Sequence, residues 1–238
     1  MVDQDFWVSD ITGDFNFVKH NGTDYNGFKD YQKEIDERFS KLELKRERNE
    51  RIANLEKWDK SLPDRWQNAK LNLIKKPVVE KILKALQEKS NGSFFLHGES
   101  GAGKTFVAYA LVRRMIGHGI VSTSQVKMVS ESVLFNWVSR GFQGQDMIVQ
   151  LLNSKYKLYL FDGIGTLNDR EAEKVASVWE QILDHIYSND LSAIFTSADD
   201  LERFVTNLSP SGETKLRTLV EKRVLKVESD GSISSKKQ

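Results

Sequence analysis

The most constraining segment of the chain is a glycine-rich loop between two apolar stretches. Residues 98–105 read Gly-Glu-Ser-Gly-Ala-Gly-Lys-Thr, which fits the phosphate-binding pattern G-x-x-x-x-G-K-[ST]. An apolar strand is expected before the loop, over residues 93–96, and an apolar helix after it, over residues 104–116. In such a loop, successive backbone N–H groups surround an anion, and the following helix directs its positive N-terminal end at the same place. The segment therefore predicts a site for a phosphorylated ligand.

The residue types in the loop indicate how a nucleotide would be held. Lys104 would reach the outer phosphates, and the Thr105 hydroxyl would help to hold Mg²⁺. The alternative is a glycine-rich turn followed by an exposed lysine, which the flanking strand and helix disfavour. The predicted ligand-binding residues are Gly98, Glu99, Ser100, Gly101, Ala102, Gly103, Lys104 and Thr105.

The composition excludes several other kinds of protein. The 238 residues are 39% hydrophobic and 29% charged, as in a globular protein, and no apolar run is long enough to cross a bilayer. The chain has no cysteine, so disulfides and thiolate metal sites are excluded. A net charge of +1 argues against binding nucleic acid through charge alone. The N-terminus lacks the pattern of a signal peptide, so we expect a cytoplasmic protein without membrane contact.

The first 60 residues differ in pattern from the rest. Residues 1–27 have no sustained period, and we expect a loosely ordered arm there. Apolar residues then recur at steps of three and four, which predicts a helix with one apolar stripe. The stripe is made of Phe28, Tyr31, Ile35, Phe39 and Leu42. It is interpreted as a docking face for a partner protein, while the charged run at 45–51 allows the alternative of a solvated helix or linker.

From Pro63 onward, strands alternate with helices, which predicts an α/β domain with a mostly parallel sheet covered on both faces. A helix is expected from Pro77 to Asn91. The later expected strands cover 125–129, 157–162, 191–197 and 223–227, and the later expected helices cover 132–139, 169–186 and 200–204, with looser helix over 146–152. Asn168 and Asp199 are the expected caps of the last two helices, with Glu171 reciprocal to Asn168. The predicted organisation is an extension (1–60), a domain (61–228) and a disordered tail (229–238).

A second candidate site residue ends the strand at 157–162. Asp162 fits the Walker B acid, which holds Mg²⁺ through water; the alternative is an aspartate that caps the following turn. Phosphate-loop ATPases usually place a glutamate next, to polarise the attacking water, but this position is Gly163. The polar residue that commonly follows the strand at 191–197 is replaced by Ala198. Both departures predict that nucleotide binding is retained with weak hydrolysis, unless a substitute base such as Glu99 acts.

Four segments in this order resemble the AAA+ domain of DnaC/DnaI-type bacterial and phage replicative helicase loaders, to which the IstB-like ATP-binding proteins are also similar. The segments are Leu-Pro-Asp-Arg-Trp-Gln-Asn-Ala (62–69), the loop at 98–105, Leu-Phe-Asp-Gly-Ile-Gly (160–165) and Ala-Ile-Phe-Thr-Ser-Ala (193–198). The third lacks the second acid of the family and the fourth lacks its asparagine. The resemblance implies an AAA+ P-loop NTPase fold, with an N-terminal helical extension and no C-terminal lid domain.

The resemblance also implies a function in DNA replication. Such a protein binds ATP and Mg²⁺, and it delivers a ring-shaped DnaB-type replicative DNA helicase to DNA. Residues 1–60 would bind the helicase, although a chain without cysteine cannot build the zinc module that DnaI-type loaders carry there. The domain would self-associate on ATP and contact single-stranded DNA. Lys104 and Asp162 are then the implied catalytic residues, together with Arg223 as the arginine finger and Arg217 as the second choice.

Several alternatives are open at this point. The DNA-contact candidates, which also read as core residues, are Lys127, Phe135, Trp137, Arg140 and Phe142. An IstB-like transposition helper and a non-hydrolysing adaptor or inhibitor of a replication protein would share the same pattern. A small-molecule kinase would need an arginine-rich lid, for which the sequence between Asp162 and Ser197 has no cluster. A phage or mobile element is a natural origin for so altered a site.

Overall fold

The computed structural model describes residues 7–9, 15–17, 25–67, 69–74, 82, 92–152, 155–221, 223–228 and 233–234, with side chains from Lys33 onward except at 34, 233 and 234. The chain divides into two units, residues 1–49 and residues 50–238. In the first unit, β1 (Trp7–Ser9) pairs with β2 (Phe15–Phe17) in antiparallel fashion. Among the described residues, no helix combines the length and the apolar character needed to cross a membrane.

Helix α1 (Tyr25–Ser61) begins in the first unit and ends in the second. It is continuous through residues 45–51, so the charged run is helix rather than an irregular linker. This agrees with its composition, because lysine, arginine and glutamate are strong helix formers. Two members of the predicted stripe, Phe39 and Leu42, are exposed to 63% and 37%. The side chains of Phe28 and Tyr31 lie outside the described residues.

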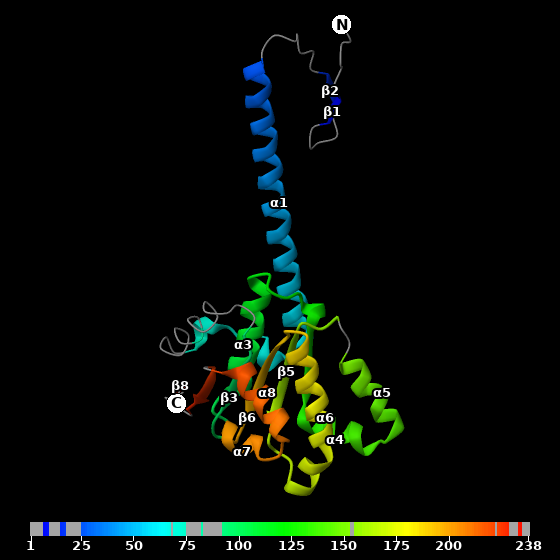
Figure 1. The fold of residues 1–238 in the computed structure, drawn as a ribbon. Helices are drawn as coiled ribbons and strands as arrows, with labels where there is room; N and C mark the ends of the chain where they lie inside the picture. Colours follow the sequence, from blue (N-terminus) through cyan, green and yellow to red (C-terminus); the bar gives the residue numbers. More distant parts are fainter. Residues whose placement is uncertain are drawn as a thin grey trace. The chain divides into compact units, whose positions relative to one another are not determined.

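The sheet of the second unit, of which Figure 1 labels β3, β5, β6 and β8, has the strand order β4-β5-β6-β3-β7-β8. Its strands are β3 (Phe94–His97), β4 (Val126–Ser130), β5 (Leu158–Ile164), β6 (Ser192–Ser197), β7 (Val224–Val227) and β8 (Ile233–Ser234). The first five are parallel to their neighbours, and only β8 is antiparallel. The mostly parallel α/β fold predicted from the sequence is confirmed.

Helices cover both faces of this sheet. They are α3 (Lys104–Gly117), α4 (Glu131–Ser139), α5 (Phe142–Leu151), α6 (Asp169–Ser188), α7 (Leu201–Val205) and α8 (Pro210–Val220), with short 3-10 turns η1 (Asp64–Trp66), η2 (Leu71–Leu73) and η3 (Thr123–Gln125). The predicted cap of α6 is present, because the Asn168 side chain accepts from the Glu171 N–H while the Glu171 carboxylate accepts from the Asn168 N–H.

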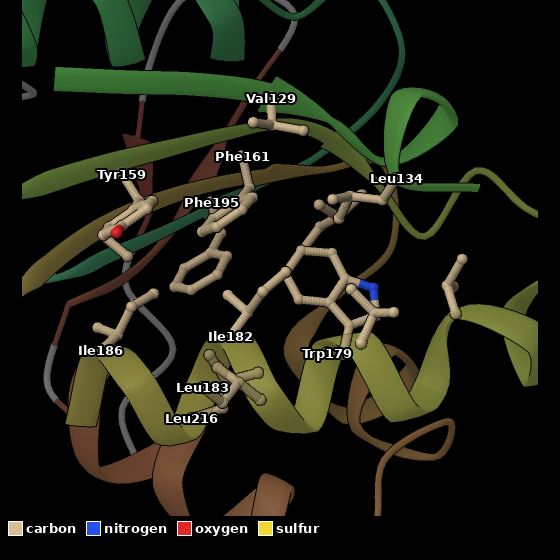
Figure 2. Close-up of a cluster of buried hydrophobic side chains, with 14 of the residues drawn as sticks. Val129, Leu134, Tyr159, Phe161, Trp179, Ile182, Leu183, Ile186, Phe195 and Leu216 are labelled. Atoms are coloured by element: carbon tan, nitrogen blue, oxygen red, sulfur yellow. The ribbon is translucent and has the colours of Figure 1, made fainter. Parts of the chain in front are cut away.

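Alternate residues of each central strand face two separate cores. On one face, α3 and the end of α1 pack on Phe94, Leu96 and Ile194. On the other face, α4 to α8 pack on Phe95, Phe161 and Phe195. Figure 2 shows Trp179 of α6 directed at the sheet, where its ring lies 5.1 Å from that of Phe161. The central strands are continuous apolar runs in the sequence because both faces of the sheet are buried.

Several boundaries differ from the sequence prediction. The compact second unit spans Glu50–Gln238, and Trp58, which lies within the extension predicted over residues 1–60, is buried and packs on Tyr109 of α3. Asp200, not Asp199, caps α7, since its carboxylate accepts from the Arg203 N–H at 3.1 Å. The looser helix expected at 146–152 is the regular helix α5, which begins at Phe142.

Two sequence predictions fall mostly outside the described residues. The helix expected from Pro77 is described only at Ile82, which is helical and fully buried. The tail after residue 228 was expected to be disordered. It is described only at Ile233 and Ser234, which pair with β7 as the short strand β8.

Candidate nucleotide site

The glycine-rich loop lies at the carboxyl edge of the sheet, where β3 ends and α3 begins. Gly101 and Gly103 have φ values of 83° and 93°, which are left-handed conformations that glycine adopts most easily. A Cβ atom at either position would meet no atom within 4 Å, so these two glycines are needed for backbone conformation rather than for space. Gly98 differs, because its φ is 141° and a Cβ there would overlap the carbonyl oxygen of Val227.

Lys104 is held over the loop by the loop's own backbone. Its Nζ donates to the carbonyl oxygens of Gly98 and Glu99, at 2.7 Å each. Partial burial lowers the pKa of Lys104, and the nearby negative charge of Asp162 opposes that shift. The ammonium group is thus partly desolvated and lies at the N-terminus of α3, where phosphate oxygens would replace the two carbonyls as acceptors.

The structure brings Thr105 and Asp162 together across 57 residues of sequence. The Thr105 hydroxyl donates to Asp162 Oδ1 at 2.9 Å. The same oxygen accepts from the hydroxyl of Thr196, on β6, at 2.6 Å. Hydroxyl and carboxylate oxygens are the hard ligands that Mg²⁺ prefers, so the Thr105–Asp162 pair fits the predicted metal site. The sequence pattern predicted that Thr105 and Asp162 lie together, but it did not indicate that Thr196 also donates a hydrogen bond to Asp162.

Gly163 follows Asp162 in an unusual conformation. Its φ is 71°, and the pairing of β5 with β6 shifts register between Phe161 and Ile164. This turns the Gly163 N–H toward β6, where it donates to the Thr196 hydroxyl at 2.9 Å. No side chain from this position can act as a base. Glu99, the suggested substitute, is exposed on the loop.

The loop after β5 is held by a buried acid that sequence analysis missed. Glu131, the first residue of α4, is 2% exposed. Its carboxylate accepts from the Thr166 N–H at 3.0 Å and from the Trp179 indole N–H at 3.3 Å. Burial raises the pKa of Glu131, and these hydrogen bonds oppose the shift. An acid in the first turn of a helix ordinarily indicates only a favourable helix dipole, so the sequence offered no signal for this role.

The two arginines predicted to act as fingers on a neighbouring subunit pack away from this chain's own loop. Arg223 is 7% exposed, and its guanidinium lies 5.9 Å from the ring centroid of Phe94, at the start of β3 and away from the loop. A Cβ at Gly92 would overlap this guanidinium, so Arg223 fills space inside the domain. Arg217 pairs with Glu202 and Glu213 at 2.7 and 2.8 Å. The finger role predicted for Arg223, with Arg217 as second choice, concerns a neighbouring subunit and stays a prediction.

The five DNA-contact candidates differ in how far they are exposed. Trp137 belongs to the core on the α6 face, and Phe135 packs against that core. Lys127 lies over the ring of Tyr156, with its Nζ 5.4 Å from the centroid. Arg140 and Phe142 are exposed at the turn between α4 and α5, and Phe142 is 86% exposed. Lys127 and Phe135 are half-buried, so the most exposed of the five candidates are Arg140 and Phe142.

Comparison with known proteins gives the fold a context. No family model and no curated protein matches the sequence. Among solved structures, DnaI has a TM-score of 0.55 at 18% identity, covering 73% of this chain and 95% of that chain. The DnaC helicase loader has a TM-score of 0.51 at 18% identity, covering 68% and 99%. The replication initiator DnaA bound to AMPPCP and single-stranded DNA has a TM-score of 0.50 at 15% identity, covering 67% and 49%, so this chain spans about half of its length. The chain therefore shares the fold of DnaI and of the DnaC helicase loader.

Proposed function

We propose that this chain, which has the fold of the AAA+ domains of DnaI, the DnaC helicase loader and DnaA, is an ATP-binding helicase loader that acts in the initiation of DNA replication. It would deliver a ring-shaped replicative helicase to DNA in the cytoplasm. The observation that carries the nucleotide part is the contact between Thr105 and Asp162 beside the loop, because it assembles a metal-binding pair where the phosphates would lie.

In this proposal each site residue has a task that its position allows. The loop N–H groups and the Lys104 ammonium bind the phosphates, and Thr105 and Asp162 hold Mg²⁺. Bound Mg²⁺ supplies positive charge that offsets the phosphates. The loops after β5 and β6 lie close together, because a Cβ atom at Gly165 would be 3.3 Å from the Asp199 carboxylate. ATP then acts as a switch, since a γ-phosphate can order these two loops.

We further propose that hydrolysis is weak. General-base help is worth about 10²–10⁴ in rate, and Gly163 offers no base. Ala198, which is exposed after β6, offers no polar group to sense the γ-phosphate. A loader of this kind would use ATP binding more than ATP turnover.

The helicase contact is assigned to the apolar stripe of α1. Phe39 and Leu42 are exposed large hydrophobic side chains on one face of that helix. Leu44, which is 64% exposed, lies on the opposite face at helical spacing. Contact with single-stranded DNA is assigned to the exposed turn at Arg140 and Phe142, since bases stack on aromatic rings beside positive charge.

A pull-down with a purified DnaB-type helicase tests the loader function. The wild-type chain should capture the helicase, and capture should change with ATP. Phe39→Ser with Leu42→Ser should lower capture about tenfold or more, because truncated interface anchors cost about 2 kcal/mol. Leu44→Ser is the matched control and should leave capture unchanged. Equal loss in the control and the stripe variant, or no capture by the wild type, would reject this assignment.

One observation favours a second candidate, a non-hydrolysing adaptor or inhibitor of a replication protein. Gly163 adopts a left-handed conformation, which disfavours any residue with a side chain, including a catalytic glutamate, at this position. An adaptor would bind its partner with the same affinity in the presence and absence of ATP. A loader would show ATP-dependent capture, and Lys104→Ala would remove that dependence.

A further inference from the structure

We infer that Thr196, a buried residue of β6, is the positioning residue for the Asp162 carboxylate and so for the metal ion that this carboxylate would hold. The inference rests on the proposed nucleotide site. It assigns a role to a side chain outside both the loop and the Asp162 strand.

The hydroxyl of Thr196 makes two hydrogen bonds, one as acceptor and one as donor. Thr196 is 1% exposed, so water does not compete for its hydrogen bonds. Its Oγ1 accepts from the Gly163 N–H at 2.9 Å and donates to Asp162 Oδ1 at 2.6 Å. Because the hydroxyl has a single proton, accepting from a backbone N–H orients that proton toward the carboxylate. The Gly163 N–H of β5 therefore orients the Thr196 hydroxyl, which in turn donates to Asp162 of the same strand.

As a consequence, one oxygen of the Asp162 carboxylate is held by hydrogen bonds and the other can accept from a metal-bound water. Oδ1 accepts from both Thr196 and Thr105, whereas within the described residues no hydrogen bond reaches Oδ2. The terminal torsion of an aspartate is broad, so the carboxylate would otherwise rotate among several positions. Two hydroxyl donors on one oxygen restrict that rotation and present the other oxygen to a metal-bound water.

Gly163 takes part in the same arrangement. Its N–H reaches Thr196 only because β5 shifts register there and Gly163 adopts a φ of 71°. A residue with a side chain would be strained in this conformation. Gly163 occupies the position where related ATPases usually have a catalytic glutamate. Its backbone N–H also orients the Thr196 hydroxyl.

Three variants test this role. Thr196→Val keeps the shape of the side chain and removes both hydrogen bonds, whereas Thr196→Ser keeps the hydroxyl. Ser93→Ala is the matched control, because Ser93 is also a buried hydroxyl that accepts a backbone N–H, from Ala193 at 2.9 Å, but at the opposite end of β6. Thermal unfolding should show a comparable small loss of stability in Thr196→Val and Ser93→Ala.

The readout is ATP affinity with Mg²⁺ and with EDTA, together with Mn²⁺ binding by electron paramagnetic resonance. Loss of a residue that orients a metal ligand typically costs 10–100-fold in metal affinity. Thr196→Val should therefore weaken Mg²⁺-dependent ATP binding and Mn²⁺ binding about tenfold or more, while ATP binding in EDTA changes less than about twofold. Thr196→Ser should restore the metal dependence, and Ser93→Ala should retain it. Equal losses with Mg²⁺ and EDTA would show a structural role and overturn the inference.

A ligand-free measurement separates this inference from the proposed function. In crystals grown without nucleotide, Asp162 should occupy more than one rotamer in Thr196→Val and a single one in Thr196→Ser. An unchanged Asp162 in Thr196→Val would overturn the positioning role even if nucleotide binds. If the wild type binds no nucleotide with Mg²⁺ or EDTA, the proposed function fails, and the rotamer result still decides the role of Thr196.

Discussion

Replacing Gly98 by alanine should destabilise the domain more than the same change at Gly101. Both glycines have positive φ, and a residue with a side chain costs about 1–2 kcal/mol in a left-handed conformation and about 1–3 kcal/mol in the sparser region where Gly98 lies. At Gly101 the added methyl meets no atom within 4 Å, so conformational strain is the whole cost. At Gly98 it overlaps the Val227 carbonyl, and relieving such an overlap costs about 1–3 kcal/mol more.

The expected loss in the free energy of unfolding is therefore about 1–2 kcal/mol for Gly101→Ala and about 2–6 kcal/mol for Gly98→Ala. Urea unfolding of the ligand-free variants, followed by tryptophan fluorescence, measures both. The midpoint should fall with little change in slope, because each variant exposes a similar surface on unfolding. Equal losses at the two positions would refute the close approach of β7 to the start of the loop.

Three further outcomes follow from buried and titratable groups. Glu131→Ala should lower the free energy of unfolding by about 2–5 kcal/mol, since the Thr166 and Trp179 N–H groups lose their acceptor; a loss below about 1 kcal/mol would contradict the observed burial. ATP affinity should fall as pH rises above the lowered pKa of free Lys104, because phosphate favours the charged amine; a flat pH profile up to the ordinary lysine pKa would contradict this. Burial raises the pKa of Tyr159 to about 12, so wild-type stability should fall as pH rises from about 10 toward 12, and Tyr159→Phe should show a smaller fall; equal pH profiles would argue against the buried hydroxyl.

Local patterns predicted most of the elements because local physics determines them. The helix α6 follows from its apolar period and from the Asn168 cap, and both are visible in the sequence. The central strands are continuous apolar runs, as expected when helices cover both faces of the sheet. The loop needs glycine at left-handed positions, so its pattern carries the geometry directly.

The contacts that complete the site are not local, and the sequence did not reveal them. Thr196 reaches Asp162 across 34 residues, and Glu131 reaches Thr166 across 35, through the register of parallel strands. The resemblance implied that Arg223 is an arginine finger, which must reach a neighbouring subunit. The burial of Arg223 against Gly92 and Phe94 was not visible in the sequence, because the pairing of β7 with β3 brings these residues together.

Calorimetric titration of ATP with Mg²⁺ into the wild type, Lys104→Ala and Asp162→Asn tests the nucleotide site most directly. The wild type should bind with one site per chain, and Lys104→Ala should lose at least about tenfold in affinity, because a charge-assisted contact with phosphate is removed. Asp162→Asn should bind ATP in EDTA as the wild type does and lose the gain that Mg²⁺ provides. Absence of binding in the wild type, or unchanged Mg²⁺-dependent binding in both variants, would contradict the site.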